Sequence, residues 1–390
     1  MCRRRGVPVA ARLVLWTLLR VSTPNPAHGP GGPEPDTSAR EYREGRPLGT
    51  EGFEKIQRGR RNDPPIWPII AGVPVSFGMA MAVMNQAPGI VLLSLVPGVL
   101  VIGTFLWLGQ IEPGTRRSQM HCVMWGATTA VSAAVVCNSL FGYFFGETAG
   151  IVVSAPIVEE TIKLLGVWWV VKPHKEGSVL LGAIHAGLVA GGFAMVENIM
   201  YFYEAYEDGL LAWAFIGRGI LTPFMHPLFT IPAAVALVSG GKTRGVSRLW
   251  GLPFAVALHA WWNGSIVLLG RHYDGEIPVW TFFVGGVYIG AFLVAGTGLM
   301  IARERTKRLY PQGIAKLAFE HDLTPEECSY FSTWRDSQTA RRRLSRRRRS
   351  SYDALHSAVW ALMRYHSGAK TRDLDSLVGD LRAARLFMRR

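Results

Sequence analysis

The sequence predicts an all-α membrane protein, a bundle of about eight transmembrane helices with both ends of the chain in the cytoplasm. Three observations lead to this fold class. Long apolar stretches fill residues 66–301, charges gather in the connectors and at both ends, and the sign of the connector charges alternates. Composition alone would not decide the class, because 49% hydrophobic residues and a mean hydropathy of +0.18 do not separate the chain from soluble proteins.

The apolar stretches are each about 18 to 28 residues long, which is the length of helix that crosses the hydrocarbon core of a bilayer. Helix is the expected structure, because backbone polar groups in lipid must be satisfied within the segment itself. The expected spans are residues 66–83, 89–108, 121–145, 150–171, 178–203, 211–238, 246–269 and 277–301.

The connector charges give the orientation. Lys and Arg precede the first span, follow the second, fourth and sixth spans, and dominate the region after the eighth. The alternate connectors are acidic, and Arg271 is their only basic residue. Because basic connectors stay on the cytoplasmic side, both termini are expected in the cytoplasm, and an odd number of spans would break the alternation.

The two ends differ from the middle. Residues 1–65 are expected to be a disordered cytoplasmic leader, because 22–65 are rich in Pro, Gly and charge; residues 7–19 only faintly resemble a signal peptide. Residues 302–390 form a basic, partly helical cytoplasmic tail that carries most of the net charge of +14 and holds seven arginines in 341–349. We expect the tail to contact anionic lipid, or alternatively another cytoplasmic protein, and expect no nucleic acid.

Ionisable residues inside the fourth span are the first functional signal. Glu159 and Glu160 are adjacent near its middle, and Lys163 follows four residues after Glu159, on the same helix face. A charge at this depth costs several kcal/mol, roughly 2.5 to 3.5 on the gentlest scale, unless it is paired or hydrated. Two neighbouring carboxylates repel each other when both ionise, so one can act as a base while the other orients it or supplies a proton. The alternative is a structural buried ion pair.

The next three spans add polar residues at similar depth. The fifth span carries Glu197 and Asn198, which we expect near the cavity of Glu159. His226 lies in the sixth span between two prolines that loosen the backbone. His259 and Asn263 lie four residues apart on one face of the seventh span.

Two further residues at this depth receive no chemical role from the sequence. We expect His185, in the fifth span, to be a packing or polar-contact residue. Arg218, in the sixth span, is expected to pair with an acidic connector or with Glu197.

Two kinds of hydrolytic chemistry fit these residues. A Glu and a His that meet can hold a water molecule and take its proton, while a second His and an Asn stabilise the oxyanion that forms at a carbonyl. Alternatively, Glu159, His226 and His259 are the three ligands of a typical hydrolytic zinc site. The chain has no HExxH motif, so the sequence leaves both versions open.

Four sequence strings carry a specific resemblance. APIVEETIKLLGV, GGFAMVENIMYF, MHPLFT and ALHAWWNGS, in this order on consecutive spans, resemble the PrsW family of intramembrane proteases. That family belongs to a larger group with the CAAX prenyl endopeptidases and the bacterial CPBP and Abi proteins. The resemblance covers about residues 66–301. It implies an endopeptidase of a bacterial cell membrane that cuts membrane-anchored proteins, as PrsW-like proteins cut anti-sigma factors.

Matched residue by residue, the resemblance implies roles for the same side chains. It places Glu159 with His226 as the water-activating pair and His259 with Asn263 as the oxyanion site. Glu160 is the second of the paired glutamates. The family's lysine and its Glu-Asn pair fall on Lys163, Glu197 and Asn198. The prenyl endopeptidases carry an arginine one residue after the position of Lys163, and this departure favours the PrsW family.

Two other classes of function use the same residues. The chain could be a transporter in which they relay protons or ions, although it has no recognisable internal repeat of the kind many transporters show. It could also be a catalytically silent membrane scaffold. Substrate-dependent flux without cleaved products would identify a transporter. Normal function of a variant lacking Glu159 and His226 would identify a silent scaffold.

Overall fold

The computed structural model describes residues 65–112, 116–171, 178–238, 244–271, 279–320, 323–367 and 374–389. These residues form helices and no strands, which confirms the all-α prediction. The expected leader, apart from residue 65, lies outside the described residues, as do 113–115, 172–177, 239–243 and 272–278 from the connectors.

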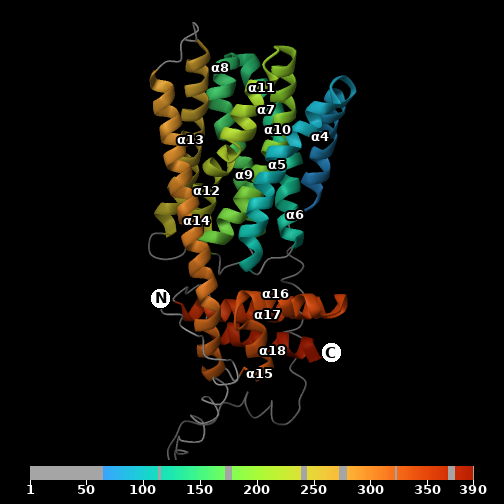
Figure 1. Cartoon of the computed structure of the whole chain (residues 1–390), viewed down its shortest axis with the longest axis vertical. Coiled ribbons are helices and arrows are strands. Elements are labelled where there is room, and N and C mark those ends of the chain that lie inside the picture. The colour runs from blue at the N-terminus through green and yellow to red at the C-terminus, as the bar shows by residue number, and fades with distance from the viewer. Residues whose placement is uncertain are drawn as a thin grey trace, which may run out of the picture. The chain divides into compact units, whose positions relative to one another are not determined.

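Seven helical segments of the described residues are long and apolar enough to cross a membrane, so the protein is a multi-pass membrane protein (Figure 1). They are α4 (Trp67–Gln86), α5 with η1 (Pro88–Leu108, Gly109–Ile111), α6 with η2 and α7 (Arg116–Trp125, Gly126–Ala130, Val131–Phe145), α10 (Val179–Glu207), α11 with η4 and α12 (Leu211–Ala214, Phe215–Leu221, Met225–Val238), α13 (Arg244–Arg271) and α14 (Val279–Glu320).

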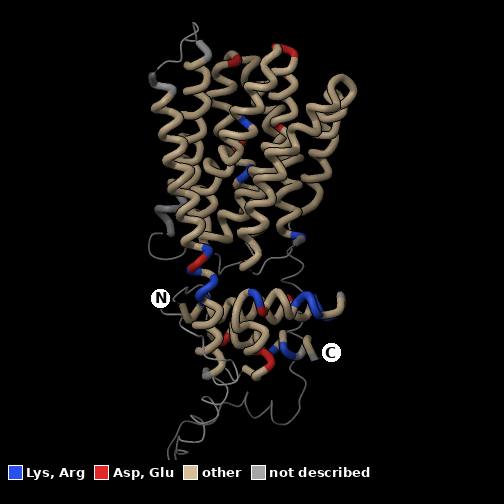
Figure 2. The backbone as a smooth tube through the Cα atoms, viewed as in Figure 1, with Lys and Arg blue, Asp and Glu red and all other residues tan. Residues whose placement is uncertain are grey.

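The fourth expected span, residues 150–171, is helical but is not one of these seven. It consists of α8 (Glu147–Ala149), η3 (Gly150–Ser154) and α9 (Ala155–Val171). Glu159, Glu160 and Lys163 lie within it, and three charges reduce its apolar character below that of its neighbours. Figure 1 shows α9 running through the middle of the bundle, and Figure 2 shows charged residues there. Within the described residues all eight expected segments are thus helical apart from a bend at 222–224, whereas the cytoplasmic position of the termini stays a prediction from connector charge.

Helix α10 is the central helix of the bundle. In its most apolar stretch 89% of the residues are buried, and the Ser178 side chain caps its first turn by accepting from the Leu181 N–H. Two glycines permit its close contact with the third span. A Cβ on Gly126 would lie 1.9 Å from the Val189 carbonyl oxygen, and a Cβ on Gly192 would lie 2.2 Å from the Val123 carbonyl oxygen. This contact fixes α10, and with it Glu197 and Asn198.

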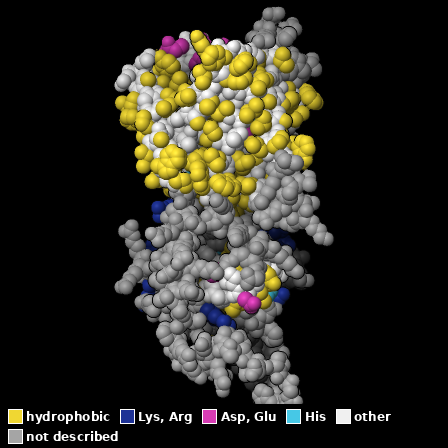
Figure 3. Space-filling model, turned by 180° about the vertical axis from the view of Figure 1, so that it is seen from behind, with side chains coloured by type: hydrophobic (Ala, Val, Ile, Leu, Met, Phe, Trp, Pro, Cys, Tyr) yellow, Lys and Arg dark blue, Asp and Glu magenta, His cyan; other side chains and the backbone are white. Residues whose placement is uncertain are grey.

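The outer helices present apolar side chains outward. In α14 only 11% of the most apolar stretch is buried inside the protein, and α13 and α4 are also largely exposed, at 17% and 28%. Figure 3 shows hydrophobic side chains spread over the surface of the bundle. Such a surface is stable in contact with lipid tails and unfavourable in water.

The last part of the chain builds a second core. The C-terminal helical domain, residues 310–389, contains the end of α14 together with α15 (Pro325–Phe331), α16 (Trp334–Arg343), α17 (Arg346–His366) and α18 (Leu374–Arg389). The Tyr310 hydroxyl donates to the Ile111 carbonyl and contacts His356 Nε2, at 3.1 and 3.0 Å. Burial lowers the pKa of His356 to about 4, so its ring is neutral near pH 7.

The α10 contact generates a stability prediction. Gly126→Ala is expected to lower the free energy of unfolding by about 1–3 kcal/mol or more, because the added methyl overlaps the Val189 carbonyl. Thermal unfolding of the purified protein in detergent measures this. Gly78→Ala is the matched control: no atom lies within 4 Å of its new Cβ, so stability should stay the same or rise. Equal stability of the two variants would contradict the proposed close packing of α10.

Candidate active site

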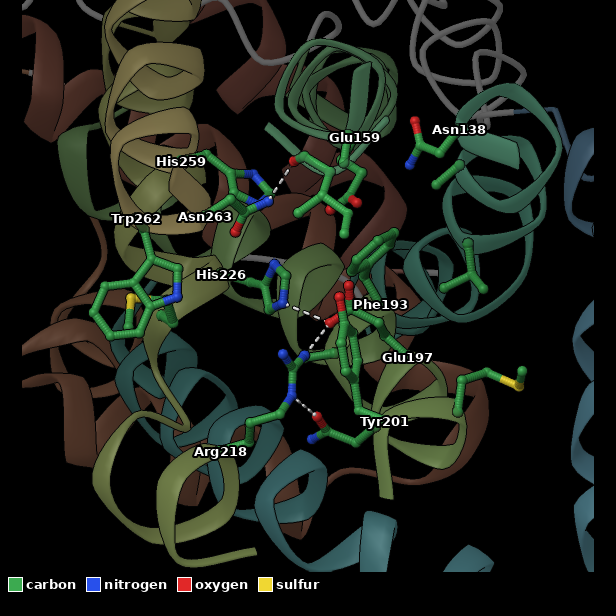
Figure 4. Close-up of a pocket in the computed structure, with 18 of the residues that line it drawn as sticks. Asn138, Glu159, Phe193, Glu197, Tyr201, Arg218, His226, His259, Trp262 and Asn263 are labelled. Carbon is green, nitrogen blue, oxygen red and sulfur yellow. Dashed lines mark hydrogen bonds and ion pairs between the residues drawn. The ribbon is translucent and has the colours of Figure 1, made fainter. Parts of the chain in front are cut away.

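One cavity of about 870 Å³ lies among α7, η3, α9, α10, η4, α12 and α13. Glu159, Glu197, His226, His259 and Asn263 line it, and Figure 4 shows their side chains converging from different helices. Asn198 and Arg218 also line it. Of the eight sequence-predicted site residues, only Glu160 and Lys163 lie behind its wall.

Lys163 is the centre of the polar network. Its side chain is fully buried, and its ammonium group donates to Glu159 Oε2 at 3.1 Å and to Glu160 Oε1 at 3.0 Å. The same nitrogen lies 3.1 Å from His226 Nδ1 and 3.9 Å above the Phe193 ring. One ammonium group therefore pairs with two carboxylates and links α9 to α12.

Glu160 supports the cavity from behind. Neighbouring residues of an α-helix point about 100° apart, so Glu159 reaches the cavity while Glu160 turns toward α12 and α13. The Thr230 hydroxyl donates to Glu160 Oε2 at 2.7 Å, and His259 Nδ1 lies 3.1 Å from Oε1. With Lys163, three donors surround this carboxylate, as a buried negative charge requires.

His226 is held from both sides of its ring. Nε2 lies 2.9 Å from Glu197 Oε2, and Nδ1 faces the Lys163 ammonium. Because a carboxylate only accepts and an ammonium only donates, Nε2 carries the proton and Nδ1 keeps a lone pair. The Glu197 carboxylate thereby sets the orientation and tautomer of His226, as carboxylates do for catalytic and metal-binding histidines.

His259 and Asn263 share one side of the cavity. The His259 ring stacks on Phe229 with centroids 4.7 Å apart, and its Nδ1 contact with Glu160 fixes its rotation. Asn263 Nδ2 donates to the Ile151 carbonyl of η3 at 2.9 Å. One of its two N–H groups is therefore engaged by the backbone, which the sequence could not indicate.

Three of the lining groups converge on one point. One ligand atom each from Glu159, His226 and His259 lies within 4.8 Å of the others. A carboxylate and two imidazoles at such distances can surround one water molecule or one divalent ion, and three protein ligands with an open fourth position are usual in hydrolytic zinc sites. The donor set thus fits a metal, although Lys163 already contacts Glu159 and His226.

Two π-helical turns shape the cavity. Gly150 and Ile151 belong to η3, and Gly217, Arg218 and Leu221 belong to η4. A π-turn inserts an extra residue into a helix and is frequent at functional sites. In η4 the inserted residue precedes the non-helical bend at 222–224 that leads to His226, so the local backbone directs both Arg218 and His226 inward.

Sequence reasoning gave several contacting residues no role. Thr230 lies four residues after His226 on the same helix face, a spacing that could have indicated it. Phe193, Tyr201 and Asn138 line the cavity without any motif of their own. His185 lies in the core away from the cavity, with Nδ1 2.8 Å from the Leu181 carbonyl oxygen.

The membrane-spanning helices thus enclose a buried carboxylate and two imidazoles beside a cavity, which are side chains that hydrolysis within a membrane can use. Residues 115–306 match the family model described as PrsW family intramembrane metalloprotease, so the chain carries a PrsW-family domain and is an intramembrane protease. Comparison with curated proteins and with solved structures gave no match.

Proposed function

We propose that the chain is an endopeptidase that cuts membrane-anchored proteins with water activated by Glu159 and His226. The observation that supports this most is the convergence of Glu159, His226 and His259 on one cavity. A peptide bond reaches a cavity among membrane helices when its own chain enters the membrane. Single-span proteins such as anti-sigma factors are therefore the proposed substrates, and a bacterial cell membrane the proposed location.

Glu159 is the proposed general base. Its carboxylate lines the cavity, and the Lys163 ammonium holds one of its oxygens, which leaves lone pairs for a water molecule. His226, oriented by Glu197 through Nε2, accepts from the same water through Nδ1 when the Lys163 ammonium bonds only to the two carboxylates. After water attacks the carbonyl carbon, the protonated Glu159 gives its proton to the leaving amine.

His259 and Asn263 form the proposed oxyanion site. His259 has a second ring nitrogen besides the one directed at Glu160, and Asn263 has a second amide N–H besides the one bonded to Ile151. Both can donate to the oxygen that becomes negative in the tetrahedral intermediate. Glu160 and Asn198 act as supports of this arrangement rather than as groups that touch the substrate.

Replacing Glu159 tests the proposal. Glu159→Gln keeps the size of the side chain and an acceptor for Lys163 but cannot take a proton, so cleavage should fall at least about 100-fold. Quantitative proteomics of membranes from cells producing either form identifies the proteins that remain uncut. Glu204→Gln, on the same helix as Glu197 but outside the cavity, is the control and should cleave normally. Equal cleavage by Glu159→Gln would refute the proposed base.

As the alternative version of this site, we propose that Glu159, His226 and His259 act as ligands of a zinc ion instead of as base and oxyanion donor, which the donor set and the family description support. When bound, zinc would supply a Lewis acid that polarises water and the carbonyl. The Lys163 ammonium competes for the lone pairs of Glu159 and His226, so Lys163→Met is expected to bind zinc more tightly.

Zinc titration with elemental analysis measures this. About one ion per chain is expected in the wild type and in His185→Gln, whose histidine is bonded elsewhere, and less in His226→Gln. If a protein that cleaves its substrate binds no zinc or other divalent ion, the metal proposal fails and the Glu159–His226 pair acts alone.

Besides the membrane-protein substrate and zinc, we propose anionic lipid as a binding partner. Arg342, Arg343 and Arg348 are exposed at the turn between α16 and α17, whereas Arg341 forms two bonds with Asp353, at 2.6 and 2.9 Å. Three exposed guanidinium groups in one turn suit lipid phosphates, at about 1 kcal/mol each.

The triple variant Arg342→Gln/Arg343→Gln/Arg348→Gln tests the lipid proposal. It should lose about 100-fold in affinity for phosphatidylglycerol, because three contacts of about 1 kcal/mol are removed. Native mass spectrometry of the full chain with added phosphatidylglycerol or phosphatidylcholine measures this. Arg335→Gln, an exposed arginine elsewhere on α16, is the control. Unchanged retention of phosphatidylglycerol by the triple variant would contradict the proposal.

A further inference from the structure

Arg218 is a charged residue of the cavity that the proposed mechanism does not use. It lies in the π-helical turn η4, and its side chain is 31% exposed. Keeping a guanidinium group at this depth costs several kcal/mol unless it is paired or hydrated. Its contacts therefore indicate what it does there.

The guanidinium group bonds to two consecutive residues of α10. Nη2 donates to Glu197 Oε2, the same oxygen that faces His226 Nε2, and Nε donates to Asn198 Oδ1 at 2.9 Å (Figure 4). The plane of the group stacks on the Tyr201 ring, 3.8 Å from its centroid. Three residues within little more than one helical turn thus fix one arginine.

These contacts require an arginine. The planar guanidinium presents donors in a rigid fork and stacks on an aromatic ring, whereas an ammonium is a compact charge on a flexible stem. A lysine could neutralise Glu197 but could not also bond Asn198 and cover Tyr201 in the same way. The arrangement is therefore specific in geometry as well as in charge.

Glu197 depends on this arginine for its position. Its side chain is 17% exposed, and its carboxylate contacts Arg218 and His226. Without Arg218, the carboxylate would keep only the imidazole contact and would turn toward water in the cavity. His226 would then lose the acceptor that fixes its tautomer and ring orientation.

We propose that Arg218 is a positioning residue for His226 that acts through Glu197. The Glu-Asn pair then has a division of roles: Glu197 orients the histidine, and Asn198 orients the arginine that holds Glu197. This inference rests on the proposed function, because it assigns Arg218 to the water-activating side of the cavity.

The proposal is tested by measuring the kinetics of Arg218→Met. The substrate is a reporter that carries the transmembrane segment of a protein that the wild type cuts and Glu159→Gln does not. A positioning residue changes the transition state more than substrate binding, so kcat should fall about 10- to 100-fold with KM nearly unchanged. Arg218→Lys should recover only a small part of kcat, because it cannot form the fork. If Arg218 instead bound the substrate, KM would rise with kcat unchanged, and this result would overturn the proposal.

Chemical rescue separates positioning from a general structural role. Arg218→Ala leaves space at the wall of the cavity, and guanidinium chloride at a non-denaturing concentration should restore part of kcat. Sodium chloride at the same ionic strength should not, and neither salt should rescue Glu159→Gln. Absence of guanidinium rescue in a folded Arg218→Ala protein would count against the proposal.

Two controls keep the result interpretable. If Arg218→Met does not fold, judged by gel filtration and thermal unfolding, Asn198→Ala replaces it: this variant removes only the acceptor of Arg218 Nε and should lower kcat by a smaller factor. Full kcat in Asn198→Ala would then overturn the proposal. If Glu159→Gln cleaves the reporter as fast as the wild type, the proposed function itself is refuted. If Glu159→Gln is inactive but Arg218→Met keeps the kcat of the wild type, only this inference is refuted.

Discussion

The buried ammonium of Lys163 is the interaction on which the site depends. A fully buried cation among membrane helices is stable only when negative and lone-pair partners surround it, and Glu159, Glu160 and His226 supply them. These partners come from α9 and α12, and Glu160 extends the network to His259 on α13. Satisfying one charge therefore brings three helices into register and gathers the groups that the cavity exposes.

Hydropathy was enough to predict the helices, because the length of an apolar segment and the positions of its flanking charges are properties of the sequence. The π-turns η3 and η4 were not predictable. An inserted residue in a helix depends on what packs against it, and the bond from Asn263 to the Ile151 carbonyl arises only in the folded bundle. Residues 150–171 show where hydropathy stops being informative. Their charged residues lower the hydropathy of the segment, and several of the side chains that pair with these charges lie on other helices.

The sequence predicted that four side chains gather in one cavity, because each lies at a similar depth within its apolar segment. They are Glu159, Glu197, His226 and His259. Which side each of two adjacent glutamates faces did not follow. Helix geometry separates Glu159 from Glu160 by about 100°, but only the positions of Thr230 and His259 determine which one meets the cavity. Arg218 likewise gains a role only through the side chains that surround it.

Helix α14 has a mechanical consequence. Its 42 residues extend about 63 Å, roughly twice the hydrocarbon thickness, so one continuous helix belongs to both the bundle and the C-terminal helical domain. Tyr310 on this helix bonds the end of the second span, and Arg303 covers Trp107 there. The C-terminal helical domain is thus joined to the bundle by α14 and by its contacts with the second span, and Pro311, which removes a backbone hydrogen bond inside α14 where the domain begins, is the point at which this helix can bend.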